Sequence, residues 1–317
     1  MKDFYFAIWR ATWREQLILI VLSASVAALA AVPLDYQKQI VNELGAGVEE
    51  ATLYRLAVEM MGIILLSLAL KWLLGFQSGL TGEDVIRRLR HVVVDDAARP
   101  SQDRRPLVRS GTLANMVSSE AEEVGKFAGT AISEPLLQIG TLFSVIGYIA
   151  ATQPRLGLLA FLVVLPQAVI VMVTQRRINR LVGERVIVLR DSVDIATSER
   201  VEAEVSKILS DFDSIYDLRR RIFVWKLSTK FVLSAINGAG TVGVLLLGGL
   251  LVIEGRSDVG TVVAATVGLS RLQQPWRQLI AFYRSLSAVR VKFELMRDVL
   301  VCARDARGRS GQRGAPA

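Results

Sequence analysis

The chain has 317 residues, of which 52% are hydrophobic and 21% are charged, and its formal net charge is +8. This composition is too apolar for an ordinary soluble protein, yet it keeps enough charge for a sizeable polar part. One cysteine and one histidine exclude an intrachain disulfide and a zinc site built from clustered cysteines and histidines.

Residues 1–15 are predicted to form an amphipathic helix that lies at the membrane interface. Tyr5, Trp9 and Trp13 recur at helical spacing, and two arginines fall on another face. Aromatic and basic residues are enriched where a helix meets lipid headgroups. The alternatives are that the aromatic residues continue the first span, or that this end of the chain is a cleaved signal peptide.

Six apolar segments follow, and each is close to the length of a membrane-spanning helix. They lie at residues 17–34, 56–74, 135–151, 156–173, 231–253 and 259–282. A helix needs roughly 20 mainly apolar residues to cross the hydrocarbon core. The connections between the segments are 21, 60, 4, 57 and 5 residues long. This pattern predicts an all-α polytopic membrane protein with six transmembrane helices and two long loops on one side.

Lysine and arginine residues concentrate on the side that carries the two long loops. That side holds three before the first segment, eight and twelve in the long loops, and eight after the sixth segment, whereas the opposite side holds four. Positive charge marks the cytoplasmic side of a membrane protein. We therefore expect a cell (inner) membrane protein with both termini in the cytoplasm, and we attribute the basic charge to topology rather than to nucleic-acid binding.

The two long loops are predicted to be helical arms that extend the membrane helices into the cytoplasm. Apolar residues recur at 3- and 4-residue steps through residues 113–131, 178–196 and 208–225. Such spacing is typical of amphipathic helices that pack on neighbours. Pro100 and Pro106 mark the first turn because proline breaks a helix. By symmetry the second turn is placed near residues 191–200.

The composition changes abruptly after residue 300. The last residues are rich in Arg, Gly and Ala and have no apolar period, which predicts a flexible tail. We therefore expect three parts: the interfacial helix at residues 1–15, a six-helix transmembrane domain at residues 16–300, and a tail at residues 301–317.

Several short stretches, in their order and spacing, resemble the transmembrane domain of exporter-type ABC transporters. They are S-G-T-L at 110–113 with S-E-A-E-E-V at 119–124, S-E-R-V at 198–201, V-G-T-V-V-A at 259–264, and L-Q-Q-P-W at 272–276 with K-F-E-L-M-R-D at 292–298. Ala203 and Glu204 depart from the Gly-Ile that is usual in the family. The resemblance implies that two such domains, identical or similar, pair around a substrate cavity. It also implies that the cytoplasmic turns seat in ATP-binding domains.

The chain contains no G-x-x-x-x-G-K-[ST] phosphate loop. We therefore expect no enzymatic activity and no cofactor in this chain, with ATP and Mg²⁺ bound by a partner ATPase. Residues 238–243 match G-x-G-x-x-G, but they lie within 23 uncharged residues with no αβ unit around them. These small residues are predicted to let transmembrane helices pack closely.

Polar residues in the sixth apolar segment are predicted to line the substrate pathway. Arg271, Gln274, Arg277 and Gln278 follow 3- and 4-residue steps, and Pro275 can kink the helix. Charged residues within spans are costly and usually face a cavity or a partner. The alternative is that the helix has already entered the cytoplasm near Arg277.

Glu59 in the second apolar segment is a further pathway candidate, although snorkelling to the interface would also explain its place. The family resemblance adds residues near the two turns that would contact the ATPase. These coupling residues are Arg104, Arg105, Asp194 and Glu199.

The expected function is the membrane-spanning permease subunit of an ATP-driven, exporter-like ABC transport system that relies on a separate ATPase. One alternative is an ATP-independent carrier driven by protons, for which Glu59 would be the membrane-embedded carboxylate. Others are a non-transporting regulatory or binding subunit, and the membrane half of a longer protein.

Overall fold

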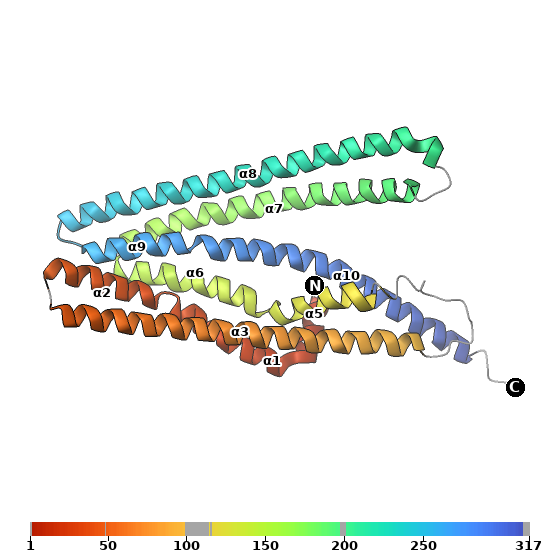
Figure 1. Cartoon of the computed structure of the whole chain (residues 1–317), viewed down its shortest axis with the longest axis horizontal. Coiled ribbons are helices and arrows are strands. Elements are labelled where there is room, and N and C mark those ends of the chain that lie inside the picture. The colour runs from red at the N-terminus through yellow and green to blue at the C-terminus, as the bar shows by residue number, and fades with distance from the viewer. Residues whose placement is uncertain (1, 48, 99–113, 115, 197–200, 313–317) are drawn as a thin grey trace. The chain divides into compact units, whose positions relative to one another are not determined.

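A computed structural model describes residues 2–47, 49–98, 114, 116–196 and 201–312. Within these residues the chain is helical apart from short turns and contains no β-strand, which confirms the all-α fold class (Figure 1). The chain divides into two compact units, Met1–Val145 with Gln273–Ala317, and Ile146–Leu272. Each unit is described by itself.

The first unit is built mainly from the N-terminal half of the chain. Its elements are α1 (Lys2–Leu29), α2 (Val32–Ala46), α3 (Glu50–Ala98), the π-helix η1 (Met116–Glu120), α5 (Ala121–Thr130), most of α6 (Ser133–Thr152) and α10 (Gln273–Gln312). Helix α1 is kinked at Thr12, where φ is −138° and ψ is 33°. The chain thus changes direction near the end of the predicted N-terminal helix, four residues before the predicted transmembrane domain.

Helix α10 differs from the sequence prediction at its end. It remains helical through residues 301–312, where we predicted a flexible tail, and residues 313–317 lie outside the described residues. Alanine and arginine are strong helix formers, and a helix that already exists is extended at little cost. The absence of an apolar period therefore did not end the helix.

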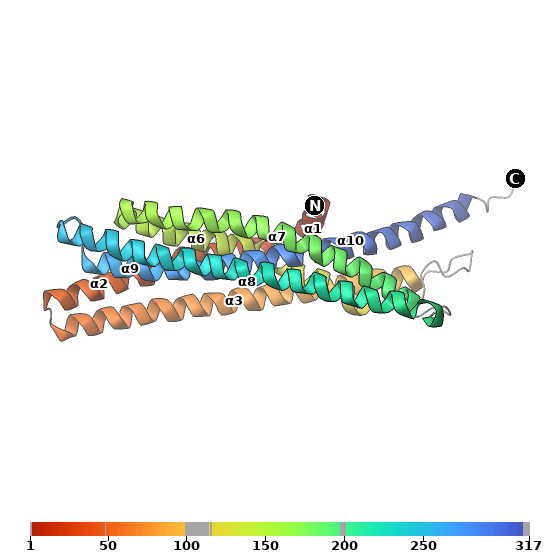
Figure 2. The ribbon, with the colours of Figure 1, turned by 90° about the horizontal axis from the view of Figure 1, so that it is seen from above.

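The second unit is an antiparallel hairpin with a short helix added. It holds the end of α6, then α7 (Pro154–Ala196), α8 (Val201–Ile253) and α9 (Val259–Arg271). Helices α7 and α8 lie side by side (Figures 1 and 2). Buried Ile178 and Leu181 of α7 pack with Ile222 of α8. This cluster confirms the helical periodicity that the sequence indicated in the second long loop.

Helix–helix contacts in the second unit depend on small residues. A Cβ atom at Gly240 of α8 would lie 2.8 Å from a methyl group of Val163, and one at Gly248 would lie 2.7 Å from a methyl group of Val262. Gly240 belongs to the G-x-G-x-x-G stretch, so its role is the close helix packing that the sequence predicted. Asp258 begins α9 by accepting a 2.7 Å hydrogen bond from the Thr261 amide.

Five stretches in the described part of the chain are long and apolar enough to cross a membrane. They are Thr12–Ala46, Glu50–Asp95, Met116–Thr152, Pro154–Leu189 and Val205–Ile253. They contain the first five apolar segments of the sequence. The sixth segment is not one helix, because α9 ends at Arg271 and α10 begins at Gln273.

Candidate functional site

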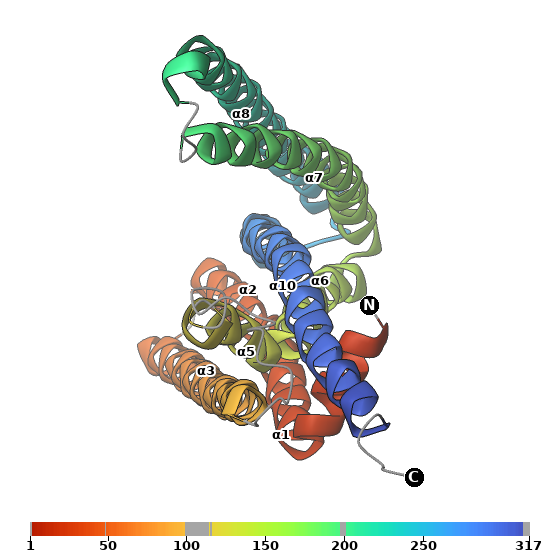
Figure 3. The same cartoon turned by 90° about the vertical axis from the view of Figure 1, so that its right-hand side faces the viewer.

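Helix α5 lies at the centre of the first unit, between α3, α1 and α10 (Figure 3). Its approach to α3 is so close that the two backbones nearly touch. A Cβ atom at Gly129 would lie 2.2 Å from the backbone oxygen of Ser78, and one at Gly125 would lie 2.9 Å from the backbone oxygen of Gly82. The Ser78 hydroxyl also donates a 2.9 Å hydrogen bond to the Gly129 carbonyl. No other side chain than hydrogen fits at Gly129.

Apolar side chains from α1, α3 and α10 also pack against the buried face of α5. The Phe127 ring stacks on that of Phe282 of α10, with 5.3 Å between ring centroids. The buried members of this cluster are Ile8, Val93, Met116, Ala121, Val124, Phe127, Ala128, Ala131, Leu286 and Val289. We call α5 with its contacts from α1, α3 and α10 the α5 junction. It joins four helices that are far apart in the sequence.

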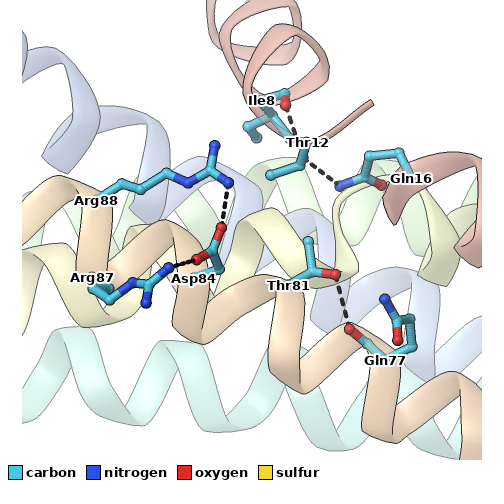
Figure 4. A network of polar contacts seen from close by, with 8 residues as sticks. All are labelled: Ile8, Thr12, Gln16, Gln77, Thr81, Asp84, Arg87 and Arg88. Atoms are coloured by element: carbon cyan, nitrogen blue, oxygen red, sulfur yellow. Dashed lines mark hydrogen bonds and ion pairs between the residues drawn. The ribbon is translucent and has the colours of Figure 1, made fainter. Parts of the chain in front are cut away.

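A buried polar side chain, Gln16, ties the kink of α1 to the α5 junction. Its Nε2 donates to the Ala128 carbonyl at 3.1 Å. It also donates to the Thr12 hydroxyl at 3.3 Å, and the Thr12 hydroxyl donates to the Ile8 carbonyl at 2.9 Å (Figure 4). Gln16 is fully buried, and its Oε1 has no hydrogen-bond partner among the described residues. Buried polar atoms without partners are uncommon and costly, so the two donated bonds must hold this side chain in place.

Ion pairs cross the exposed side of the α5 junction. Lys292 of α10 pairs with Glu123 of α5 at 2.5 Å, and Lys126 pairs with Glu122 one turn earlier on α5. The Lys126–Glu122 pair is solvent-exposed and contributes little to stability. The Lys292–Glu123 pair matters more for geometry, because it joins the charged face of α5 to α10, the helix that carries three of the predicted pathway residues.

The chain enters α5 through the π-helix η1. Arg90 of α3 donates from Nε to the Val117 carbonyl at 2.9 Å, within η1. A π-helix leaves carbonyl groups without their usual α-helical partners, and it is often found at functional sites. The arginine supplies a partner from a neighbouring helix, so the irregular turn is stabilised by α3.

The predicted pathway residues of the sixth segment are divided by the structure. Arg271 is the last residue of α9 and is half-buried, whereas Gln274, Arg277 and Gln278 are exposed on α10. The Arg277 guanidinium donates to Gln273 Oε1 at 3.2 Å. Only the three residues on α10 are therefore related by helical spacing, because α9 ends at Arg271.

Proline explains where the interruption falls. Residue 275 would donate its amide hydrogen to the Arg271 carbonyl in a continuous helix, but Pro275 has no such hydrogen and its ring crowds that carbonyl. Leu272 instead donates its amide to the Leu269 carbonyl at 3.2 Å, and both leucine side chains are buried. The helix is therefore interrupted at Leu272, three residues before the proline at which we predicted a kink.

Glu59 lies on α3, away from these residues in the sequence, and its side chain is 46% exposed. It pairs with Arg55, one turn earlier on the same helix, at 3.8 Å. Within the described part of the chain no hydrogen bond or ion pair links it to the residues of α10. The structure therefore places Glu59 next to a cation rather than alone in the span.

The predicted coupling residues fall where the structure is not described. Arg104, Arg105 and Glu199 lie outside the described residues, and Asp194 lies near the end of α7 with its side chain outside them as well. Over the described residues, no three His, Cys, Asp or Glu side chains gather closely enough to hold a metal ion.

Sequence reasoning missed the α5 junction and Gln16. A signal was available, since Thr12 and Gln16 are polar, four residues apart, and stand directly before an apolar segment. Polar residues at this spacing share a helix face. The close contact between Ser78 and Gly129 had no such local signal.

The model of the ABC transporter transmembrane region matches residues 16–191, which is more than half of the chain. The chain belongs to this family. The ABC transporter match begins at Gln16 and ends within α7, so it includes α3, η1, α5 and α6. No curated protein shows a significant match. The residues of the α5 junction therefore lie within the matched range, apart from those of α10 and of the start of α1.

Membership in the ABC family makes this chain a transporter membrane domain. Transmembrane regions of this family generally work with an ATPase and with a second transmembrane region. The stretches at 198–201, 259–264 and 272–298 that resemble exporters lie outside the matched residues. Their roles stay predictions.

Proposed function

We propose that the chain is the permease subunit of an ATP-driven, exporter-like ABC system and relies on a separate ATPase. The observation that carries the proposal, beside the family, is the length of the helices. At 1.5 Å per residue, α3, α7 and α8 span about 74, 65 and 80 Å. The hydrocarbon core is only ~30 Å thick, so each helix extends well beyond it.

The apolar segments lie toward one end of each long helix, so the extensions form two arms on the same side of the membrane. In the proposal, residues 99–109 and 191–200 at the tips of the arms contact the ATPase, and α9 with the start of α10 forms a sixth span broken at Leu272. The α5 junction supports a lever mechanism. Its backbone contacts leave no space for α3 and α5 to slide past each other.

Exposed apolar side chains on the second arm, formed by α7 and α8, support the proposal of a partner subunit. Large apolar side chains are exposed on α7 and α8 beyond the charge-free segments, among them Ile187 at 62%, Leu209 at 58% and Phe212 at 50%. Exposed apolar surface of this kind marks protein–protein contact in parts of a chain outside the lipid. We propose that a second transmembrane subunit, identical or similar, covers it.

The decisive experiment replaces both turns, residues 99–109 and 191–200, with Gly/Ser linkers of equal length. We expect ATPase activity that co-purifies with the tagged chain from native membranes to fall by about tenfold or more, because the docking surface is lost. The control replaces residues 254–257 at the opposite end of the spans and keeps Asp258. Equal ATPase recovery with both replaced chains would exclude docking at the turns.

Orientation has its own test, because Cys302 is the only cysteine. We propose cytoplasmic termini, so a membrane-impermeant maleimide should label Cys302 in permeabilised spheroplasts and not in intact ones. A C302S/E254C variant should be labelled in intact spheroplasts, since Glu254 lies in the exposed turn after α8. The reverse pattern would invert the topology.

The proton-driven alternative makes a different prediction. Uptake would then be lost in a Glu59→Gln variant and would persist without the ATPase. A non-transporting subunit would show no transport even when reconstituted with its ATPase.

A further inference from the structure

Two arms of this chain carry the same spacing of one aspartate and two arginines. On α3, Asp84 binds both Arg87 and Arg88, each at 2.5 Å (Figure 4). One carboxylate thereby pairs with both guanidinium groups of that turn. These arginines are exposed, so burial does not force the pairing. It follows from their spacing, three and four residues after Asp84 on the same helix.

On α8, Asp217 stands three and four residues before Arg220 and Arg221, as in α3. Here neither arginine forms an ion pair or a hydrogen bond with any residue that the structure describes. Both side chains are exposed. The same sequence spacing therefore leaves two guanidinium groups available on α8.

Arg220 and Arg221 line a surface concavity together with Val224, Trp225 and Asp217, all from one face of α8. The planar guanidinium group presents paired donors that match a phosphate. Tryptophan is enriched where lipid headgroups meet the hydrocarbon, because its ring is apolar and its N–H is polar. The two guanidinium groups can bind the phosphate of a phospholipid, and the indole and the valine can contact the apolar part next to it.

The position along the hairpin agrees with this chemistry. Arg220 and Arg221 lie about 15 Å before the charge-free segment at 231–253, at 1.5 Å per residue. On α7, Arg176 and Arg177 follow the charge-free segment at 156–173 within four residues, and they are also exposed. Packing of Ile178 with Ile222 brings the two pairs of arginines to nearby levels. The long arginine side chains can reach upward to the headgroups from there.

We propose that Arg220, Arg221 and Trp225 bind the phosphate headgroup of an anionic phospholipid in the leaflet nearest the arms. Arg176 and Arg177 add positive charge to the same layer. The inference rests on the membrane placement of α7 and α8 under the proposed function, and it needs no ATPase. A lipid held there would fix the depth at which the second arm leaves the membrane.

Native mass spectrometry of the full chain, incubated with equal amounts of phosphatidylglycerol and phosphatidylcholine, tests the proposal. The double variant R220Q/R221Q should retain about 25-fold less phosphatidylglycerol than the wild type, since each basic residue near an anionic surface contributes a factor of about five. The matched control R87Q/R88Q should retain the wild-type amount, because both of those guanidinium groups are already paired with Asp84. Equal loss in both variants, or no loss in R220Q/R221Q, would overturn the proposal.

Two further measurements keep the result decisive. Asp217→Asn removes the carboxylate of the concavity and should at least double phosphatidylglycerol retention, which tests the site even if R220Q/R221Q fails to fold. Inorganic phosphate at millimolar concentration should not displace the lipid. Displacement would show a site for free anions instead and would overturn the lipid assignment. Failure of the ATPase experiment would leave these results unaffected.

Discussion

Gly129→Val should prevent the first unit from folding stably. The new side chain would enter the space now held by the backbone oxygen of Ser78, 2.2 Å from the position of its Cβ. A backbone atom of a packed helix cannot move away as a flexible side chain can. Overpacking of this kind typically costs about 1–3 kcal/mol and occasionally more, and we expect the upper end here. Thermal unfolding in detergent and the yield of monodisperse protein measure the loss.

The matched control is Gly79→Ala on α3, one residue from Ser78 in the sequence. No atom lies within 4 Å of a Cβ at Gly79, so alanine should stabilise the helix by up to about 1 kcal/mol through its higher propensity. Gly129→Ala should still destabilise the protein, because its Cβ meets the same oxygen. If both alanine variants were equally stable, α3 and α5 would not be in contact as described.

Substitution of Gln16 should reveal how strongly the α5 junction depends on one hydrogen bond. Gln16→Glu replaces the donor to the Ala128 carbonyl with an acceptor and buries a carboxylate where the described hydrogen-bond partners of Gln16, Ala128 and Thr12, are uncharged. Burying an unpaired charge is among the most destabilising changes, and we expect a loss of about 3 kcal/mol or more. Chemical unfolding in detergent, followed by circular dichroism, gives the free energy.

Gln16→Leu is the matched variant that changes hydrogen bonding at this position without introducing a charge. Leucine fills a similar volume and removes the unpaired Oε1, but leaves the Ala128 carbonyl without its donor, so the cost should be about 1–2 kcal/mol. We expect Gln16→Glu to lower the free energy of unfolding more than Gln16→Leu does. Equal costs would mean that water reaches Gln16, contrary to its complete burial.

The elements that could be predicted from the sequence are those with local signals. Apolar length located five stretches that are long and apolar enough to cross a membrane. Helical periodicity located the helices of the second long loop, where Ile178 and Ile222 are buried as expected. The contact of Gly129 with Ser78 could not be predicted, because it joins residues 51 positions apart and small residues fit many partners. The division of the sixth segment could be predicted only in part. Pro275 predicts a kink, but it does not predict that α9 ends at Arg271.

Candidate site residues divide in the same way. The arginines and glutamines around Pro275 were identified by residue type, yet their common face assumed an unbroken helix. Gln16 was overlooked because it stands at the edge of an apolar segment, where a polar residue is expected at the surface. Its burial depends on a kink at Thr12 that brings α1 against α5, and nothing in the nearby sequence required that contact.

The π-helix at Met116–Glu120 determines which face of the following helix, α5, points toward α3. A π-turn accommodates one residue more than an α-turn, and each residue in an α-helix corresponds to a rotation of 100°. If this turn were regular, the glycine face of α5 would point about a quarter-turn away from α3. Arg90 of α3, by donating to the Val117 carbonyl, therefore helps to fix the rotation of α5 relative to α3. Deletion of a single residue here would misalign helices that the deletion never touches.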